Sequence, residues 1–423
     1  MVLSMVFLLV LSLVGALLES ASIQMTRSRK RADVDLALES TFAEYHMELL
    51  EVYDIFSRFS QEDALVKRLE DYGADGMEHE LVGQEVLTDH GGSAYYRQAI
   101  CYIKNKLHLN DTDFPEEEYV EEELPYEEKK ETVSGELETL LKEEEEGLIK
   151  KESPLEWAEN LKGKGILSLL VAEPEQLSDF TIEPETLPSH RELKKGTFGR
   201  GREEIGDKMY FLSYLDEHFS SYGKGQKEGA LAYEKEYLLM GRKSDRENLE
   251  GVCQTIVNLR MAVNYGYLLT DATRRAEAEA MAVTLCSMVL NPQIEPLVKQ
   301  ALLLTWAYGE SIVDVRGLLK GGKVPLVKTA ETWQLQLANV CKLGTAKEIS
   351  GEKKQESGLS YEDYVKGLLL IEETENLCMR SLDLVEANLH VKTDQCVTRV
   401  EVQTTLQLRR GIKDVFVTSF RYQ

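Results

Sequence analysis

The chain has 423 residues, 43% of them hydrophobic, which is enough to fill the cores of two or three ordinary domains. Its formal net charge of -25 at pH 7 argues against nucleic acid as a partner, because phosphates require a basic surface. Six cysteines occur without a C-x-x-C pair or a nearby histidine. We therefore expect free thiols, although an even number also allows disulfides, and we expect no metal site and no cofactor.

Residues 1–18 (MVLSMVFLLVLSLVGALL) form an apolar run without any charged residue. As a helix rising about 1.5 Å per residue, the run would cover most of a hydrocarbon core of about 30 Å. It is longer than the apolar part of a signal peptide, and no Lys or Arg precedes it. The run predicts a retained, single-pass transmembrane helix, with a signal peptide cut near Ser22 as the alternative.

Residues 19–72 are predicted to continue as an amphipathic stalk helix, because they contain no Pro or Gly and repeat apolar residues at helical spacing. The large apolar residues of the stalk cannot remain in water. They must pack on the body of the chain or on another subunit, and the second alternative would make the stalk an assembly element. These residues are Phe42, Tyr45, Leu49 and Phe56.

Residues 73–110 are predicted to add a strand at Glu78 to His90 and a helix after Gly91 to the folded body. Residues 111–152 carry about half of the net charge and few large apolar side chains. This composition is typical of a solvated acidic linker or arm.

Residues 153–423 are predicted to form one α+β domain. The expected helices cover 209–219, 247–269, 273–290, 296–319 and a last stretch from Ser360 past Val385. Strands are expected at 231–241 and in a terminal hairpin of 397–408 and 415–422. The fold class is thus α+β: a transmembrane helix that continues into a stalk, then a mainly helical body with a small antiparallel sheet.

One polar group stands out in the predicted helices. Glu310 and Asp314 are one helical turn apart, a spacing that suits a metal or an acid and base pair. Arg260 and Asn264 are expected on a neighbouring helix, so a buried, paired network that sets helix register is the simpler interpretation. The whole group is Arg260, Asn264, Trp306, Tyr308, Glu310, Asp314 and Arg316. We assign no catalytic and no metal-binding residue.

The N-terminal segment resembles the start of TadE/TadG-like, pseudopilin-like proteins of the Flp (Tad) pilus system. The chain as a whole resembles an uncharacterised family of Gram-positive bacterial membrane proteins, a domain of unknown function. The segments that carry the resemblance are LAYEKEYLLMGRKSDRENL (231–249), NLRMAVNYGYL (258–268), TWAYGESIVDVRGLLKGGKVPLVK (305–328) and LSYEDYVKGLLL (359–370).

The resemblance implies an extracytoplasmic body behind a membrane helix, whereas the basic cluster at 27–31 alone would place the body in the cytoplasm. We expect a non-enzymatic component or accessory of a Tad/Flp-like pilus or secretion system. Its partners would be the membrane and other pilus subunits, or a second copy bound through the stalk. The alternatives are a surface-anchored enzyme with a site between the Arg260 and Glu310 helices, and a membrane-tethered cytoplasmic interaction protein.

Overall fold

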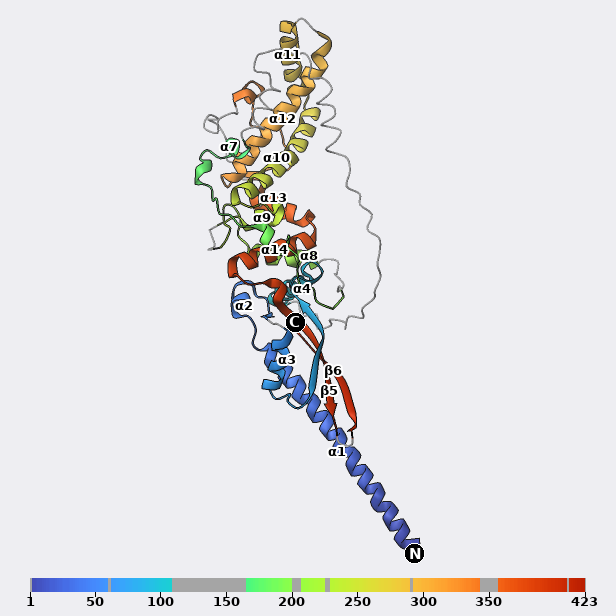
Figure 1. Cartoon of the computed structure of the whole chain (residues 1–423). Helices are drawn as coiled ribbons and strands as arrows, with labels where there is room; N and C mark the ends of the chain where they lie inside the picture. Colours follow the sequence, from blue (N-terminus) through green and yellow to red (C-terminus); the bar gives the residue numbers. More distant parts are fainter. Residues whose placement is uncertain are drawn as a thin grey trace. The chain divides into compact units, whose positions relative to one another are not determined.

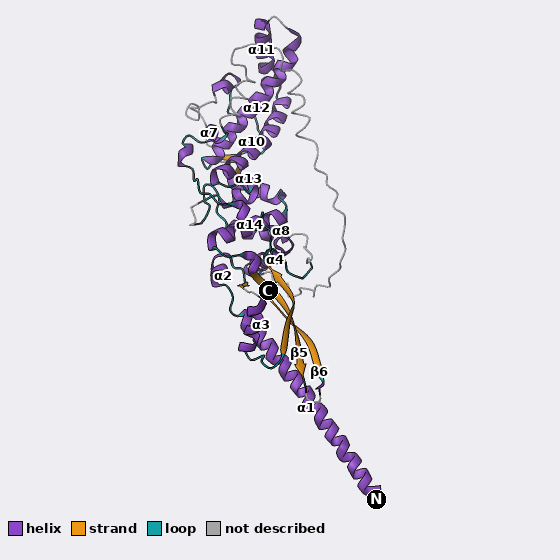
Figure 2. Cartoon of the chain, viewed as in Figure 1, coloured by secondary structure: helices purple, strands orange, loops and turns teal. Residues whose placement is uncertain are grey.

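The computed structural model describes residues 2–59, 62–108, 165–199, 207–224, 229–289, 292–342, 357–408 and 411–422. The predicted α+β class is confirmed, since helices dominate and the strands form two small antiparallel sheets (Figure 2). The acidic segment 111–152 lies outside the described residues.

The chain divides into two compact units. Unit 1 takes its described residues from Met1–Tyr119, Glu183–Phe219 and Glu372–Gln423, and unit 2 from Val120–Ile182 and Ser220–Ile371. This division differs from the single domain predicted over 153–423, because parts of that range belong to each unit. Unit 1 is therefore assembled from segments that are distant in the sequence.

Unit 1 is organised around α1 (Val2–Phe42), a helix of 41 residues (Figure 1). Good helix formers such as Leu, Ala, Met and Arg fill most of its positions, and it contains no Pro. Its second half buries four apolar side chains, namely Val34, Ala37, Leu38 and Phe42. Among the described residues, α1 is the one helix long and apolar enough to cross a membrane.

The predicted stalk helix over 19–72 is interrupted after Phe42. Two shorter helices follow, α2 (Met47–Tyr53) and α3 (Glu62–Asp71). Neither Gly nor Pro causes the break. His46 caps α2 instead, since its Nδ1 accepts a hydrogen bond from the Leu49 amide at 3.3 Å.

Unit 1 also contains the larger sheet. Its central strand β5 (Cys396–Gln407) pairs antiparallel with β2 (Glu78–Val86) and with β6 (Lys413–Arg421). The short β1 (Arg58–Phe59) pairs with the start of β5. The predicted C-terminal hairpin and the strand at Glu78 are thus confirmed.

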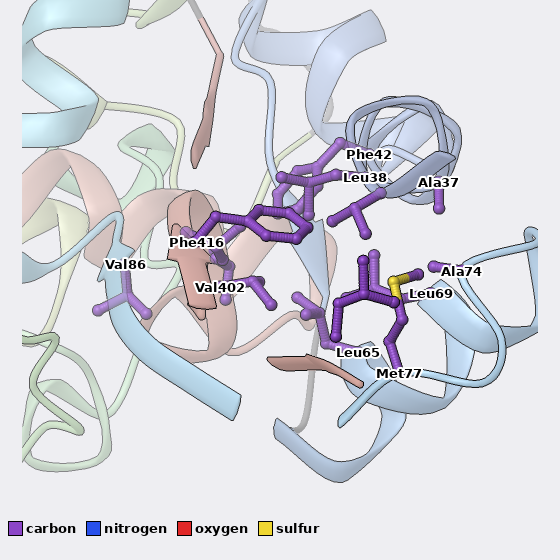
Figure 3. Close-up of a cluster of buried hydrophobic side chains, with 14 residues drawn as sticks. Ala37, Leu38, Phe42, Leu65, Leu69, Ala74, Met77, Val86, Val402 and Phe416 are labelled. Atoms are coloured by element: carbon purple, nitrogen blue, oxygen red, sulfur yellow. The ribbon is translucent and has the colours of Figure 1, made fainter. Parts of the chain in front are cut away.

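One hydrophobic core of unit 1 lies between α1, α3 and one face of this sheet. Figure 3 shows Leu38 and Phe42 of α1 facing Leu65 of α3 and Val402 and Phe416 of the sheet. Alternate β5 residues reach this core because side chains alternate between the faces of a strand. The sheet therefore covers only the second half of α1.

Three more helices complete unit 1: α4 (Asp89–Lys106), α8 (Asp207–His218) and α14 (Thr374–Leu389). α4 packs against both of the others. At its start Gly92 has φ 85°, and a Cβ atom there would lie 2.9 Å from Cβ of Cys378 on α14. Only glycine meets both conditions without strain.

Unit 2 contains the three helices predicted in series, and all three are confirmed. They are α10 (Asp245–Thr270), α11 (Ala272–Val289) and α12 (Glu295–Leu319). α12 packs against both α10 and α11. Ser244 caps α10 as its residue type suggests, because its side chain accepts from the Glu247 amide at 3.2 Å.

Two elements predicted within residues 153–423 are wrong. The strand expected at 231–241 is the helix α9 (Glu234–Met240), which ends at Gly241 with φ 62°. The last predicted helix is two helices, α13 (Tyr361–Ile371) and α14, and they belong to different units.

The remaining elements are short. They are α7 (Leu167–Leu170), the paired strands β3 (Lys323–Val324) and β4 (Leu359–Ser360), and 3-10 turns at Pro174–Gln176, Pro184–Thr186, Pro292–Ile294, Leu337–Lys342 and Thr393–Gln395.

Candidate functional site

The polar group predicted from the sequence forms an ionic network inside unit 2. Arg260 of α10 and Asp314 of α12 are joined by an ion pair, with Nη2 2.9 Å from Oδ2. Lys328, which follows β3, lies 2.6 Å from the other carboxylate oxygen of Asp314. All three side chains are fully buried. α10 and α12 pack side by side, so their facing residues meet without any distortion of the helices.

Glu310, one turn before Asp314 on α12, extends this network. Its Oε1 lies 2.7 Å from Nζ of Lys328, and its carboxylate also accepts the backbone amides of Gln334 and Leu335 at 2.9 and 2.7 Å. Burial raises the pKa of Glu310, and the nearby Lys328 counteracts this effect. The network thus contains two cations and two carboxylates, and its formal charge is zero.

Neutral groups complete the hydrogen bonding. The Asn264 amide donates to Oγ of Ser311 at 3.0 Å and to Asp314 at 3.1 Å. Arg260 lies 3.3 Å from the hydroxyl of Tyr364 on α13. The network therefore joins α10, α12 and α13, as expected for a buried ionic group that fixes the register of packed helices.

The network also fastens the loop that follows β3. Nη1 of Arg260 donates to the carbonyl oxygens of Pro325 and Leu326 at 3.0 and 2.8 Å. The indoles of Trp306 and Trp333 both donate to the Leu335 carbonyl at 2.8 Å. Buried charges and two tryptophans hold the backbone of this loop, while the side chains of Leu326 and the adjacent valine point to solvent.

The structure brings together most of the predicted polar residues but not all of them. Tyr308 is only half-buried and lies outside the hydrogen-bonded network that we describe. Arg316 is buried elsewhere, with Nε 2.5 Å from the Leu169 carbonyl. Lys328, the cation that links both carboxylates, was not predicted from the sequence. Nothing in its local sequence distinguishes this lysine from a surface lysine.

The geometry favours a structural role for the network. The carboxylates of Glu310 and Asp314 are each neutralised by a cation of the same unit. None of the contacts given above involves a histidine. In the part of the chain that the structure describes, no group of three or more His, Cys, Asp or Glu residues could hold a metal ion. Cys101, Cys253, Cys286, Cys378 and Cys396 are free thiols.

The four stalk residues lie in unit 1 and contact other residues of unit 1. Phe42 stacks on Phe420 with ring centroids 4.5 Å apart. Phe56 stacks on Tyr422 at 5.6 Å and meets the edge of Tyr45 at 5.5 Å. Leu49 is buried as well. Of the two alternatives for this stripe, the structure has the first, in which it packs on the chain itself.

The first half of α1 has a different environment. Its apolar side chains are exposed on every side of the helix, including consecutive residues, so no single stripe could be covered by one packing partner. These residues are Met5, Phe7, Leu8, Leu9, Val10, Leu11, Leu13, Val14, Leu17 and Leu18.

Fold and site together define an α+β protein with an exposed apolar N-terminal helix and a structural ionic network in its second unit. The chain belongs to a family of unknown function (DUF5702), whose model matches residues 143–408. The match includes the network residues and excludes α1. No curated protein and no solved structure shows significant similarity to the chain.

Proposed function

We propose that the protein is a membrane-anchored, extracytoplasmic component or accessory of a Tad/Flp-like pilus or secretion system in a Gram-positive bacterium, and that it is not an enzyme. α1 would anchor the chain as a single pass, and the body would bind other subunits. The TadE-like part of the proposal and the orientation rest on the resemblance of the N-terminal segment.

The observation that carries the proposal is the contrast between the two halves of α1. The second half is covered by a sheet, whereas the first half exposes large apolar side chains all round. Transfer of each such side chain from water into an apolar environment is favourable by about 1.5–3 kcal/mol. A helix that is apolar on all sides is stable in a lipid bilayer or in the core of an assembly.

The non-enzymatic part rests on the ionic network. Its charged groups are fully buried and satisfy one another, and they also hold the backbone of a loop. A catalytic acid or base needs an accessible proton and a substrate within hydrogen-bond reach. A group of this kind serves the shape of the body, which suits a protein whose role is to bind and to space its partners.

Membrane anchoring is tested by fractionating cells that express the full chain. Replacing Leu9 and Leu13 with Arg should move the protein out of the membrane pellet, because each Arg in a transmembrane helix costs about 2.5–3.5 kcal/mol. Leu36→Arg is the matched control, since Leu36 is exposed in the second half of α1. A wild-type chain that is soluble and has lost its first residues would contradict the anchor.

Orientation and assembly need separate measurements. A Cys introduced at the exposed Thr284 of α11 should react with a membrane-impermeant maleimide in intact protoplasts. Labelling only after lysis would place the body in the cytoplasm.

Neighbouring genes for a secretion ATPase and TadC-like membrane proteins, together with loss of pilus or secreted product on deletion, would support the assembly role. Normal assembly in the deletion strain would contradict it.

A further inference from the structure

We propose that the tip of the β5–β6 hairpin and the adjacent turn of α1 form a lipid-binding surface that contacts anionic headgroups. We call this surface the hairpin collar and define it by Met25, Arg29, Ile412 and Lys413. The inference rests on the proposed membrane anchor. It adds a specific lipid contact that an anchor alone does not require.

The position of the collar follows from the contacts of β6 with α1. Asp414 lies 3.5 Å from Nε of Arg27 and 3.7 Å from Nη2 of Arg31. At the other end of the strand, Phe420 stacks on Phe42. β6 therefore runs along α1 away from the apolar half, and the turn of the hairpin lies on the side of the anchor (Figure 1).

Helix geometry then gives the depth of the collar. Arg27 is nine residues beyond Leu18, a rise of about 14 Å, and Ile412 precedes Asp414 by two residues, up to about 7 Å closer to the anchor. Met25 and Ile412 would thus lie about 7–10 Å beyond the end of the apolar run, and the backbone of Arg29 about 17 Å beyond it, with its side chain tilted back toward the anchor. The polar layer of a bilayer is of similar depth, about 5–8 Å on each side.

The chemistry of the collar suits this layer. Met25 and Ile412 are exposed apolar side chains. Arg29, one helical turn after Met25, and Lys413, which follows Ile412 in β6, are exposed cations. Three acidic residues near the collar are paired with other cations: Asp414 with Arg27 and Arg31, and Asp33 and Asp75 with Lys30. Apolar groups flanked by cations are typical of surfaces that insert at an anionic membrane boundary.

The charge of the collar is opposite in sign to the net charge of the chain, which supports an anionic lipid as its ligand. The chain as a whole carries a net charge of -25 and would be repelled by an anionic bilayer. A local basic surface beside the anchor would hold unit 1 against the headgroups despite this repulsion. Near an anionic membrane, each Lys or Arg raises the fraction of the protein surface that is in contact with the headgroups by about fivefold.

The test places a tryptophan in the collar of the full chain. Ile412→Trp and Val417→Trp are reconstituted into nanodiscs that contain brominated phosphatidylglycerol or brominated phosphatidylcholine. Val417 is the matched control, because it is also exposed but lies about 17 Å further along the strand direction. Emission of the unsubstituted chain, which has three tryptophans, is subtracted.

We expect quenching at position 412 and little at 417, with stronger quenching in phosphatidylglycerol. Adding Arg29→Gln and Lys413→Gln should remove the preference for phosphatidylglycerol. Equal quenching at 412 and 417, or a lipid preference that survives the two charge substitutions, would overturn the collar. Failure of the chain to enter nanodiscs of either lipid would instead overturn the anchor, so the two proposals fail separately.

Discussion

Two of the groups of ion pairs in the described residues use similar residue types in different environments. In unit 2, Arg260, Lys328, Glu310 and Asp314 are completely buried. In unit 1, Arg31 is 52% exposed, and its pair with Asp414 is longer, at 3.7 Å. From this difference in burial we expect the two groups to differ in what each ion pair contributes to stability.

Two physical effects explain this difference. Water screens the pairs of Asp414 with Arg27 and Arg31, and exposed pairs contribute about 0–1 kcal/mol each. Burial removes the screening in unit 2, but each charge has lost its hydration and depends on its partner. Removing one partner should therefore be severe in the buried network and mild in the exposed pairs.

The largest effect is expected for Lys328→Met. The substitution leaves two neighbouring carboxylates, Glu310 and Asp314, buried with only Arg260 as a cation. We expect the free energy of unfolding of unit 2 to fall by about 3–5 kcal/mol. Urea unfolding followed by tryptophan emission measures this, because Trp306 and Trp333 lie beside the network.

Lys323→Met is the matched control for this experiment. Lys323 is close in the sequence but exposed, so its substitution should change stability by less than about 0.5 kcal/mol. If both variants unfold at the same urea concentration as the wild type, the buried network does not support unit 2 as described.

Sequence patterns predicted the parts of the molecule that depend on local composition. The uncharged run at 1–18 predicted a membrane-length helix, and alternating β-branched residues at 397–408 predicted β5. Glu310 and Asp314 could be singled out because a helix places residues four apart on one face.

The remaining features depend on tertiary contacts that no local pattern records. α1 ends at Phe42 although helix formers continue, and tertiary contacts fix the chain beyond it: Glu44 accepts hydrogen bonds from Arg58 at 3.3 Å and Tyr72 at 2.7 Å. Lys328 enters the network from a loop that folds back onto α12. α9 alternates like a strand in sequence, but burial of its charged residues Glu234 and Glu236 among partners in unit 2 favours the helix.

A second, intermediate effect is expected at Glu236, which sharpens the comparison because this buried acid contacts neutral partners. Its Oε1 accepts from the Tyr361 hydroxyl at 2.8 Å and from the Tyr222 amide at 3.0 Å. Desolvation raises the pKa of Glu236 to about 7. The native state then holds this proton more tightly than the unfolded chain does.

The sign of the pH dependence follows from this shift. Between about pH 4.5 and 7, Glu236 binds more protons in the native state than in the unfolded chain. The contribution of Glu236 to the free energy of unfolding therefore falls as pH rises. Glu236→Gln should remove this loss and make unit 2 more stable than wild type by about 2–3 kcal/mol at pH 8, with little difference at pH 4.5. The exposed Glu331→Gln is the control. A difference that does not change with pH would contradict the prediction.

The smallest effect on stability is expected for Asp414→Asn, which removes the acidic partner of Arg27 and Arg31. Because both pairs are partly exposed, β6 should lose at most about 1 kcal/mol of local stability, and less at high salt. Hydrogen exchange of peptides covering 411–422 measures this loss. The same substitution leaves the hairpin collar more positive, so in the Ile412→Trp background it should strengthen quenching of the introduced indole by brominated phosphatidylglycerol. A large loss of protection with no gain in quenching would mean that Asp414 mainly holds β6 against α1.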